Sequence, residues 1–158
     1  MITHFPQLRQ QTVWSCLPTA VLCVLEYFGR SDVGMGQVAD WCRVRSGGAC
    51  LWDDSIDGLR DALKTEFDLE VMEGDWNVIR EAVEENDVPV IVTIANPSPL
   101  AELVGDHAVV VFQIGYFEGF EERVVYMDPE SGTYESKQIE EFLQWWDTPE
   151  QRGFLLRP

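Results

Sequence analysis

The spacing of apolar residues changes along this chain at Val88, and this change constrains the fold more than any other feature. Before Val88 the apolar residues recur at helical intervals, and after it they form short β-branched runs with one further helical stretch. Helices followed by strands indicate an α+β protein, in which a helical layer packs on an antiparallel sheet. Because 158 residues is close to the length of one average domain, we expect residues 1–158 to form a single domain.

The first part of the chain is predicted to be helical. An apolar run begins at Cys16 and stops at Gly29, which is a favourable residue just after a helix. Gly47 and Gly48 place a loop over residues 45–54, and Ser55 is predicted to cap the helix that follows this loop. Asp75 or Trp76 is expected to begin the last helix of this part. The four predicted helices cover residues 16–28, 37–44, 55–63 and 75–86.

The second part of the chain is predicted to build the sheet. Its first strand is a short β-branched run that is typical of a buried strand, and the NPSP segment at residues 96–99 ends it. Gly119 and its acidic neighbours suit a hairpin connection between the second and third strands. One more helix is expected over residues 138–146. The four predicted strands cover residues 88–95, 108–115, 123–127 and 153–157.

The chain is strongly acidic, with 28 acidic residues, 11 basic residues and a formal net charge of −17. Such a surface repels nucleic acid and anionic lipid, so we expect neither as a partner. It favours basic partners or solubility in concentrated salt, and the charge alone does not choose between them. No apolar run approaches the ~18 residues of a membrane span, and the first residues do not resemble a signal peptide. We therefore expect a cytoplasmic protein.

The four cysteines are Cys16, Cys23, Cys42 and Cys50. In a reducing compartment we expect these cysteines to be free thiols rather than disulfides. No two of them have the spacing of a zinc site, so no bound metal is expected. Cys16 stands at the start of a helix, where unpaired N–H groups and the helix dipole favour a thiolate. That position leaves a nucleophile and a buried structural cysteine equally open. Cys23 lies two turns further along among apolar neighbours and is predicted to be a core residue.

His107 and Asp128 are predicted to meet at one edge of the sheet. His107 directly precedes the strand at 108–115, and Asp128 directly follows the strand at 123–127. In an antiparallel pair the start of one strand lies beside the end of the next. A carboxylate in that place can accept a hydrogen bond from the imidazole and fix its tautomer. Taken singly, His107 also fits a solvent-facing residue, and Asp128 followed by Pro129 also fits a turn.

Gln10 lies six residues before Cys16. A primary amide there can donate a hydrogen bond to a developing oxyanion, beside the backbone N–H of the nucleophile. If the cysteine were not a nucleophile, Gln10 would be an ordinary surface residue.

Taken in order, several segments resemble the papain-like cysteine peptidase clan, and most closely the bacteriocin-processing peptidases that remove double-glycine leaders. These segments are Gln10 with Cys16, the Tyr27-Phe28-Gly29 helix end, GDHAVVV around His107 and MDPESG around Asp128. The resemblance covers about residues 7 to 132 and implies a papain-like fold without a cofactor. It also implies that Cys16 is the nucleophile, His107 the general base and then acid, and Asp128 the group that orients His107. Gln10 and the Cys16 amide would form the oxyanion hole.

The sequence departs from this family at the nucleophile. The family usually has Asp-Cys-Gly, whereas this chain has Ser15-Cys16-Leu17-Pro18, and Leu17 adds bulk beside the expected cleft. No membrane segments of a transporter follow the domain, so we expect a stand-alone relative of the leader peptidases. Trp14, Trp52 and Leu17 are the candidate substrate-binding residues, and Trp76 is a further aromatic candidate.

The function predicted from these residues is a cysteine peptidase that acts on a peptide or an exposed protein segment, with a weak preference for basic substrates. Two alternatives remain open. A transglutaminase-like enzyme would use the same residues to transfer the acyl group to an amine. A catalytically silent module of the same fold would bind a partner without chemistry.

Overall fold

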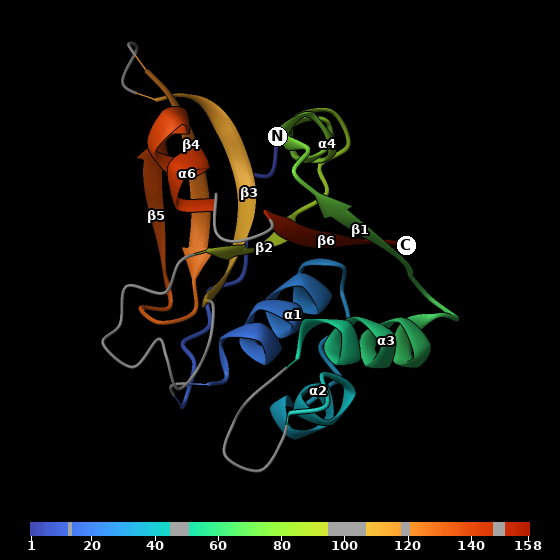
Figure 1. Ribbon diagram of the computed structural model, residues 1–158. Helices are drawn as coiled ribbons and strands as arrows, with labels where there is room; N and C mark the ends of the chain where they lie inside the picture. The colour runs from blue at the N-terminus through green and yellow to red at the C-terminus, as the bar shows by residue number, and fades with distance from the viewer. Residues whose placement is uncertain (13, 45–50, 95–106, 118–120, 147–150) are drawn as a thin grey trace.

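An antiparallel sheet runs through the centre of the molecule (Figure 1). The computed structural model describes residues 1–12, 14–44, 51–94, 107–117, 121–146 and 151–158. Six strands of these residues pair in the order β1-β6-β2-β3-β4-β5, and every neighbouring pair is antiparallel. The strands are β1 (Asp68–Glu73), β2 (Val90–Ile94), β3 (His107–Phe117), β4 (Glu121–Asp128), β5 (Thr133–Gln138) and β6 (Arg152–Arg157).

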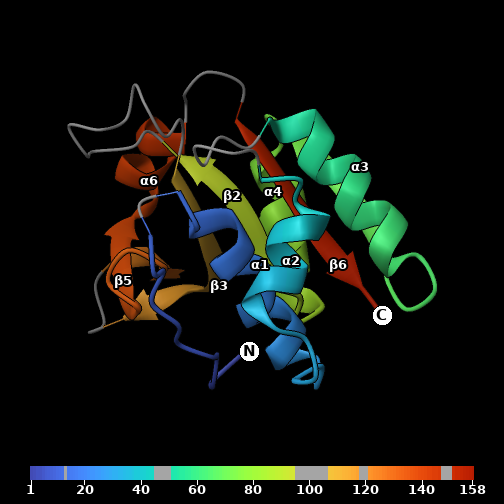
Figure 2. The same cartoon turned by 90° about the horizontal axis from the view of Figure 1, so that it is seen from below.

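Helices cover both faces of this sheet (Figures 1 and 2). One face carries α1 (Cys16–Tyr27), α2 (Met35–Trp41) and α3 (Trp52–Leu63). The other carries α4 (Trp76–Arg80), the π-helical turn η1 (Glu81–Glu85) and α6 (Ile139–Trp146). The longest of these helices have 12 residues. Within the described ranges, no helix has both the length and the apolar character that crossing a membrane would require.

Strand β3 separates the two hydrophobic cores because its side chains alternate between the faces. Ala108 and Val110 pack in the core under α1, while Val109 and Val111 pack in the core under η1 and α6. All four side chains are buried. The apolar run of β3 is therefore explained by a strand that is covered on both faces.

The predicted α+β class is confirmed, since helices pack on an antiparallel sheet. The structure has two strands and one helical layer more than predicted. Two strands were not expected. Strand β1 comes from the helical part of the chain and pairs with β6, and β5 is a largely exposed edge strand beside β4. Both are short edge strands: β5 is polar, and in β1 the apolar residues are interrupted by acidic ones, so neither has the continuous apolar run by which a buried strand is recognised. The second helical layer was not expected either.

The helix boundaries show one clear error around Ser55. The predicted loop at 45–54 overlaps α3, which begins at Trp52, and residues 45–50 lie outside the described residues. Ser55 is not a cap but a buried residue within α3, where its hydroxyl donates a 2.6 Å hydrogen bond to the Cys42 carbonyl. The serine therefore ties α3 to the end of α2. The local sequence does not distinguish such a buried serine from one that caps a helix.

The helix predicted at 37–44 is shifted, since α2 spans Met35–Trp41, whereas the boundaries predicted at Asp75 and Gly29 agree with the structure. Asp75 caps α4, because its carboxylate accepts hydrogen bonds from the amides of Asn77 and Val78. Gly29 follows α1 with a φ of 87°, a conformation that favours glycine. The NPSP segment and the connection at Gly119 lie outside the described residues.

The contact between α2 and α3 allows a test of this packing. A Cβ atom at Gly58 would lie only 2.0 Å from the Trp41 carbonyl oxygen. We expect Gly58→Ala to lower the free energy of unfolding by about 2–3 kcal/mol, because the two helices must move apart. Urea denaturation measures this change. The control is Gly36→Ala on α2, where the added methyl meets nothing within 4 Å. Equal stabilities for the two variants would show that the helices do not approach so closely.

Candidate active site

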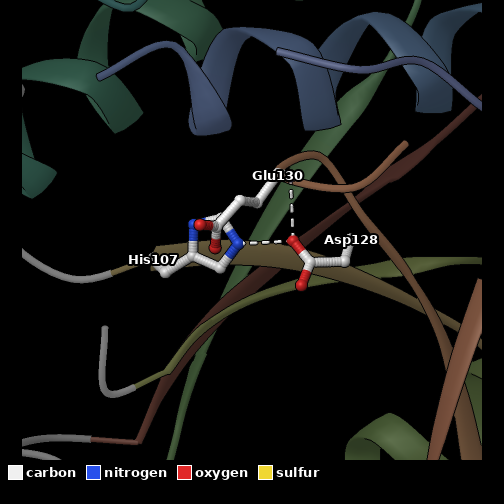
Figure 3. Close-up of side chains that lie close together, drawn as sticks. All are labelled: His107, Asp128 and Glu130. Atoms are coloured by element: carbon white, nitrogen blue, oxygen red, sulfur yellow. Dashed lines mark hydrogen bonds and ion pairs between the residues drawn. The ribbon is translucent and has the colours of Figure 1, made fainter. Parts of the chain in front are cut away.

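The pairing of β3 with β4 brings His107 and Asp128 together. Val110 pairs with Met127, so Asp128 stands one step further along β4, close to the start of β3. The His107 Nε2 and Asp128 Oδ1 atoms are 2.6 Å apart, which is the distance of a strong hydrogen bond (Figure 3). Both residues are buried. The structure thus brings these two predicted residues into contact, while their catalytic roles stay predictions.

A tight turn after β4 holds the Asp128 carboxylate in place. Asp128 Oδ1 also accepts a 3.0 Å hydrogen bond from the backbone N–H of Glu130. The Asp128 carbonyl accepts a 2.7 Å hydrogen bond from the N–H of Gly132, which has a φ of 70°. A Cβ at Gly132 would lie 2.8 Å from Arg9 Cβ, so this turn also packs tightly against the N-terminal segment. The carboxylate therefore has two donors and little freedom to move.

Cys16 is the first residue of α1 and is 9% exposed. The Ser15 hydroxyl does not cap the helix. Instead it donates to the Thr12 carbonyl and accepts from the Thr12 amide, both at 3.1 Å. This small turn fixes the segment that leads into α1, and α1 packs on β3. The thiol thus sits at the positive end of a helix that is anchored on the strand bearing His107.

The imidazole of His107 is electrostatically coupled to both of its neighbours. Burial by itself lowers the pKa of His107, because it disfavours the charged ring. Hydrogen bonding and charge interactions with Asp128 and Cys16 outweigh this effect and raise the pKa from 6.5 to about 10. Since Nε2 is bonded to Asp128, Nδ1 is the ring nitrogen left for Cys16. A buried imidazolium beside a thiol favours the thiolate, which is the nucleophilic form.

Gln10 lies next to the Asp128 turn. Its backbone N–H donates a 2.7 Å hydrogen bond to the Pro129 carbonyl, and its Nε2 donates a 2.9 Å hydrogen bond to the Thr12 carbonyl. One N–H of the side-chain amide remains to donate elsewhere. Among the described residues, the buried Gln10 Oε1 has no hydrogen-bond partner. The residue is anchored between the Asp128 turn and the segment before Cys16, and its role as an oxyanion donor stays a prediction.

The candidate substrate-binding residues occupy different surroundings. Leu17 is buried in the core under α1, and Trp52 packs edge-on against the Phe154 ring. Trp76 packs against Phe142 on the opposite face of the sheet, away from the α1 core. Trp14 is half-buried, two residues before Cys16. Contact of Trp14, Trp52 or Leu17 with a substrate stays a prediction.

The remaining cysteines differ from Cys16. Cys23 and Cys42 are buried in the core, as predicted for Cys23, and Cys50 lies outside the described residues. Burial raises the pKa of Cys23 to about 12, so this thiol stays protonated in the folded protein. Cys23 is therefore an internal reference for any test of Cys16 reactivity.

A metal ion could in principle bind to side chains of the types found here, in His107, Asp128 and Glu130. One potential ligand atom from each lies within 4.8 Å of the others. Two ligands on one tetrahedral zinc ion, each bonded at about 2.0–2.1 Å, are about 3.3 Å apart. The His107 and Asp128 atoms are closer than that, at 2.6 Å. This spacing fits a hydrogen bond rather than two ligands of one ion. That the protein needs no metal stays a prediction.

Comparison with known proteins shows the fold. No protein-family model and no curated protein matches the sequence. Among solved structures, one titled "putative C39-like peptidase from Bacillus anthracis" matches with a TM-score of 0.72 and 16% sequence identity. The match covers 100% of this chain and 96% of the other. The chain thus has the fold of a C39-like peptidase along its whole length, which agrees with the predicted class of fold.

The charge state of His107 gives a first test of the site. We expect the imidazole of the wild-type protein to stay protonated to about pH 10, and Asp128→Asn to lower this pKa, because burial then dominates. NMR titration of the ring nitrogens measures both values, and His4 provides a separate reference signal. Asp57→Asn on α3 is the control. A titration midpoint that is the same in Asp128→Asn and wild type would contradict the coupling.

Thiol reactivity gives a second test. We expect iodoacetamide to alkylate Cys16 in the folded protein and to spare Cys23, whose buried thiol stays protonated. In His107→Ala, the rate at Cys16 should fall about tenfold or more, because the imidazolium is lost. Mass spectrometry of the cysteine peptides measures each rate. Identical pH profiles for Cys16 in both proteins would exclude a thiolate–imidazolium pair.

Proposed function

We propose that this protein is a cysteine peptidase that hydrolyses a peptide bond through an acyl-enzyme on Cys16. One observation carries the proposal. His107 is held by a 2.6 Å hydrogen bond to the buried Asp128 and interacts electrostatically with Cys16, the first residue of α1. A nucleophile, a base and a group that orients the base are the parts that nucleophilic catalysis requires. The shared fold with a C39-like peptidase adds support.

The reaction would begin with the Cys16 thiolate attacking the carbonyl carbon of the scissile peptide bond. The carbonyl oxygen becomes an oxyanion as the sulfur–carbon bond forms. His107 then gives a proton to the leaving nitrogen, the carbon–nitrogen bond breaks, and the new amino terminus departs. In the second half, water loses a proton to His107 and attacks the thioester. The peptide leaves as a carboxylic acid, and the thiolate is restored.

Asp128 and Gln10 would support this chemistry without forming covalent bonds. Asp128 keeps the imidazole in one orientation and stabilises its positive charge, so that Nδ1 faces the thiol. The oxyanion would accept hydrogen bonds from the Cys16 backbone N–H at the helix start and from the Gln10 amide. Gln10 is suited to this role because its backbone is bonded to the turn that holds Asp128. The anchored donors would not have to reorganise during the reaction.

The substrate class follows from charge and from the reaction. A peptide or an exposed protein segment presents the amide bond that the site would cleave. The net charge of −17 would attract basic substrates over long distances, which raises the association rate more than it sets specificity. No described residue needs a cofactor for these steps.

Cleavage of a synthetic peptide pool, read by mass spectrometry, tests the proposal. We expect Cys16→Ala to abolish cleavage, and Gln10→Ala to reduce kcat/KM about 10²-fold, because one oxyanion donor is lost. Asp128→Asn should reduce the rate less than His107→Ala, because Asp128 only orients the base. The matched control is Cys23→Ala, which should keep cleavage and cost about 1 kcal/mol of stability. Equal loss of cleavage in folded Cys16→Ala and Cys23→Ala would overturn the assignment.

The products of the same experiment distinguish hydrolysis from acyl transfer. A peptidase releases a new carboxylate even when a primary amine is added, whereas an acyl transferase forms an amide with that amine. Intact-protein mass spectrometry should also show a transient acyl adduct on the peptide that contains Cys16. Release of amide in place of acid would replace the proposed hydrolase by a transferase with the same residues.

A further inference from the structure

Glu130 places a second carboxylate at the site, beside that of Asp128, and the sequence did not single it out. Its side chain extends from the turn after β4 back towards the imidazole of His107 (Figure 3). A Glu130 carboxylate oxygen lies within 4.8 Å of a ring nitrogen of His107 and of an Asp128 oxygen. Unlike those two residues, Glu130 is exposed. A charged group at this position is accessible to a bound substrate.

The backbone of Glu130 is fixed even though its side chain is exposed. Its N–H donates a 3.0 Å hydrogen bond to Asp128 Oδ1, the same oxygen that bonds to His107. The backbone of Glu130 is therefore tied to the hydrogen bond between Asp128 and His107. In the part of the chain that the structure describes, no lysine or arginine forms an ion pair with the exposed Glu130 carboxylate, so a cationic side chain of a substrate would not have to displace one.

The chemistry of the proposed reaction identifies which part of a substrate lies there. His107 must protonate the nitrogen that leaves, so the residue that begins the leaving fragment passes beside the imidazole. The acyl fragment stays bonded to Cys16. A carboxylate within 4.8 Å of that imidazole would therefore lie near the leaving fragment of a bound substrate.

On this basis we propose that Glu130 selects substrates with a lysine or arginine as the first residue after the scissile bond. This inference rests on the proposed peptidase function and names the substrate class of the same site. The long basic side chain would extend from the leaving nitrogen to the Glu130 carboxylate and form an ion pair with it. This preference belongs to one position of the substrate, which distinguishes it from the general attraction by the acidic surface.

The test uses the peptide that the wild-type protein cleaves best in a synthetic pool, remade with lysine, norleucine or glutamate directly after the scissile bond. We expect kcat/KM to be about fivefold higher for lysine than for norleucine, because an exposed ion pair contributes up to about that factor. Glutamate should be cleaved more slowly than norleucine. In Glu130→Gln the advantage of lysine should fall to about twofold or less. In Glu130→Lys the order should reverse, with glutamate preferred over lysine.

Glu85→Gln is the matched control, since it removes one exposed negative charge from η1, on the face of the sheet opposite α1. We expect it to keep the wild-type preference. Cys16-dependent cleavage without a preference for lysine, or with a preference that survives Glu130→Gln, overturns this inference and leaves the peptidase function standing. Absence of any Cys16-dependent cleavage overturns the peptidase function and this inference with it. If Glu85→Gln loses the preference for lysine to the same extent as Glu130→Gln, the preference arises from the overall charge, and the role of Glu130 is overturned.

Discussion

The antiparallel pairing of β3 with β4 is the constraint on which the candidate site depends. It places the first residue of one strand beside the last residue of the other, and the 2.6 Å hydrogen bond between His107 and Asp128 follows from that register. A shift of one residue in either strand would place the two side chains on opposite faces of the sheet and break the bond. A buried charged pair of this kind is tolerated only when its hydrogen bonds are satisfied. Asp128 meets this condition through the additional amide of Glu130.

The two helical layers keep this register rigid. Strand β3 lies between β2 and β4 in the sheet and is covered by α1 on one face and by η1 on the other. Alternate side chains such as Val109 and Val110 are fully buried in different cores, so the strand cannot rotate or slip without exposing apolar surface. Because α1 packs on the same strand, the thiol of Cys16 and the imidazole of His107 are positioned by one packed unit.

The turn after β4 combines several roles within a few residues. Asp128 bonds to the imidazole, the Pro129 carbonyl holds the backbone of Gln10, and Glu130 supplies both an amide for Asp128 and an exposed carboxylate. This turn therefore joins the proposed base, the proposed oxyanion donor and the proposed selectivity for basic substrates. The −17 net charge acts over the whole surface, whereas the Glu130 carboxylate acts at one position beside the reacting bond.

Much of the site was predictable because it depends on short patterns. A local sequence pattern indicates each of three parts of the site: the helix that begins at Cys16, the strand at His107 and the turn at Asp128. The antiparallel pairing of the two strands was then enough to expect that His107 meets Asp128. Cys23 was recognisable as a core residue from its apolar neighbours. For the helix and the strands, the spacing of apolar residues along the chain indicates which face of the element is buried.

Other features appear only in the tertiary structure. Strands β1 and β5 are short edge strands without a continuous apolar run. Each is stabilised as a strand by pairing with its neighbour, β1 with β6 and β5 with β4. Ser55 has the composition of a cap and becomes a buried link to the carbonyl of Cys42. Glu130 resembles any surface acid until folding sets its carboxylate beside the imidazole. The sequence by itself thus determined most of the helices, the central strands and the expectation that His107 meets Asp128. Only the tertiary structure decided the strand order, the second helical layer and the place of Glu130, because these depend on contacts between residues that lie far apart along the chain.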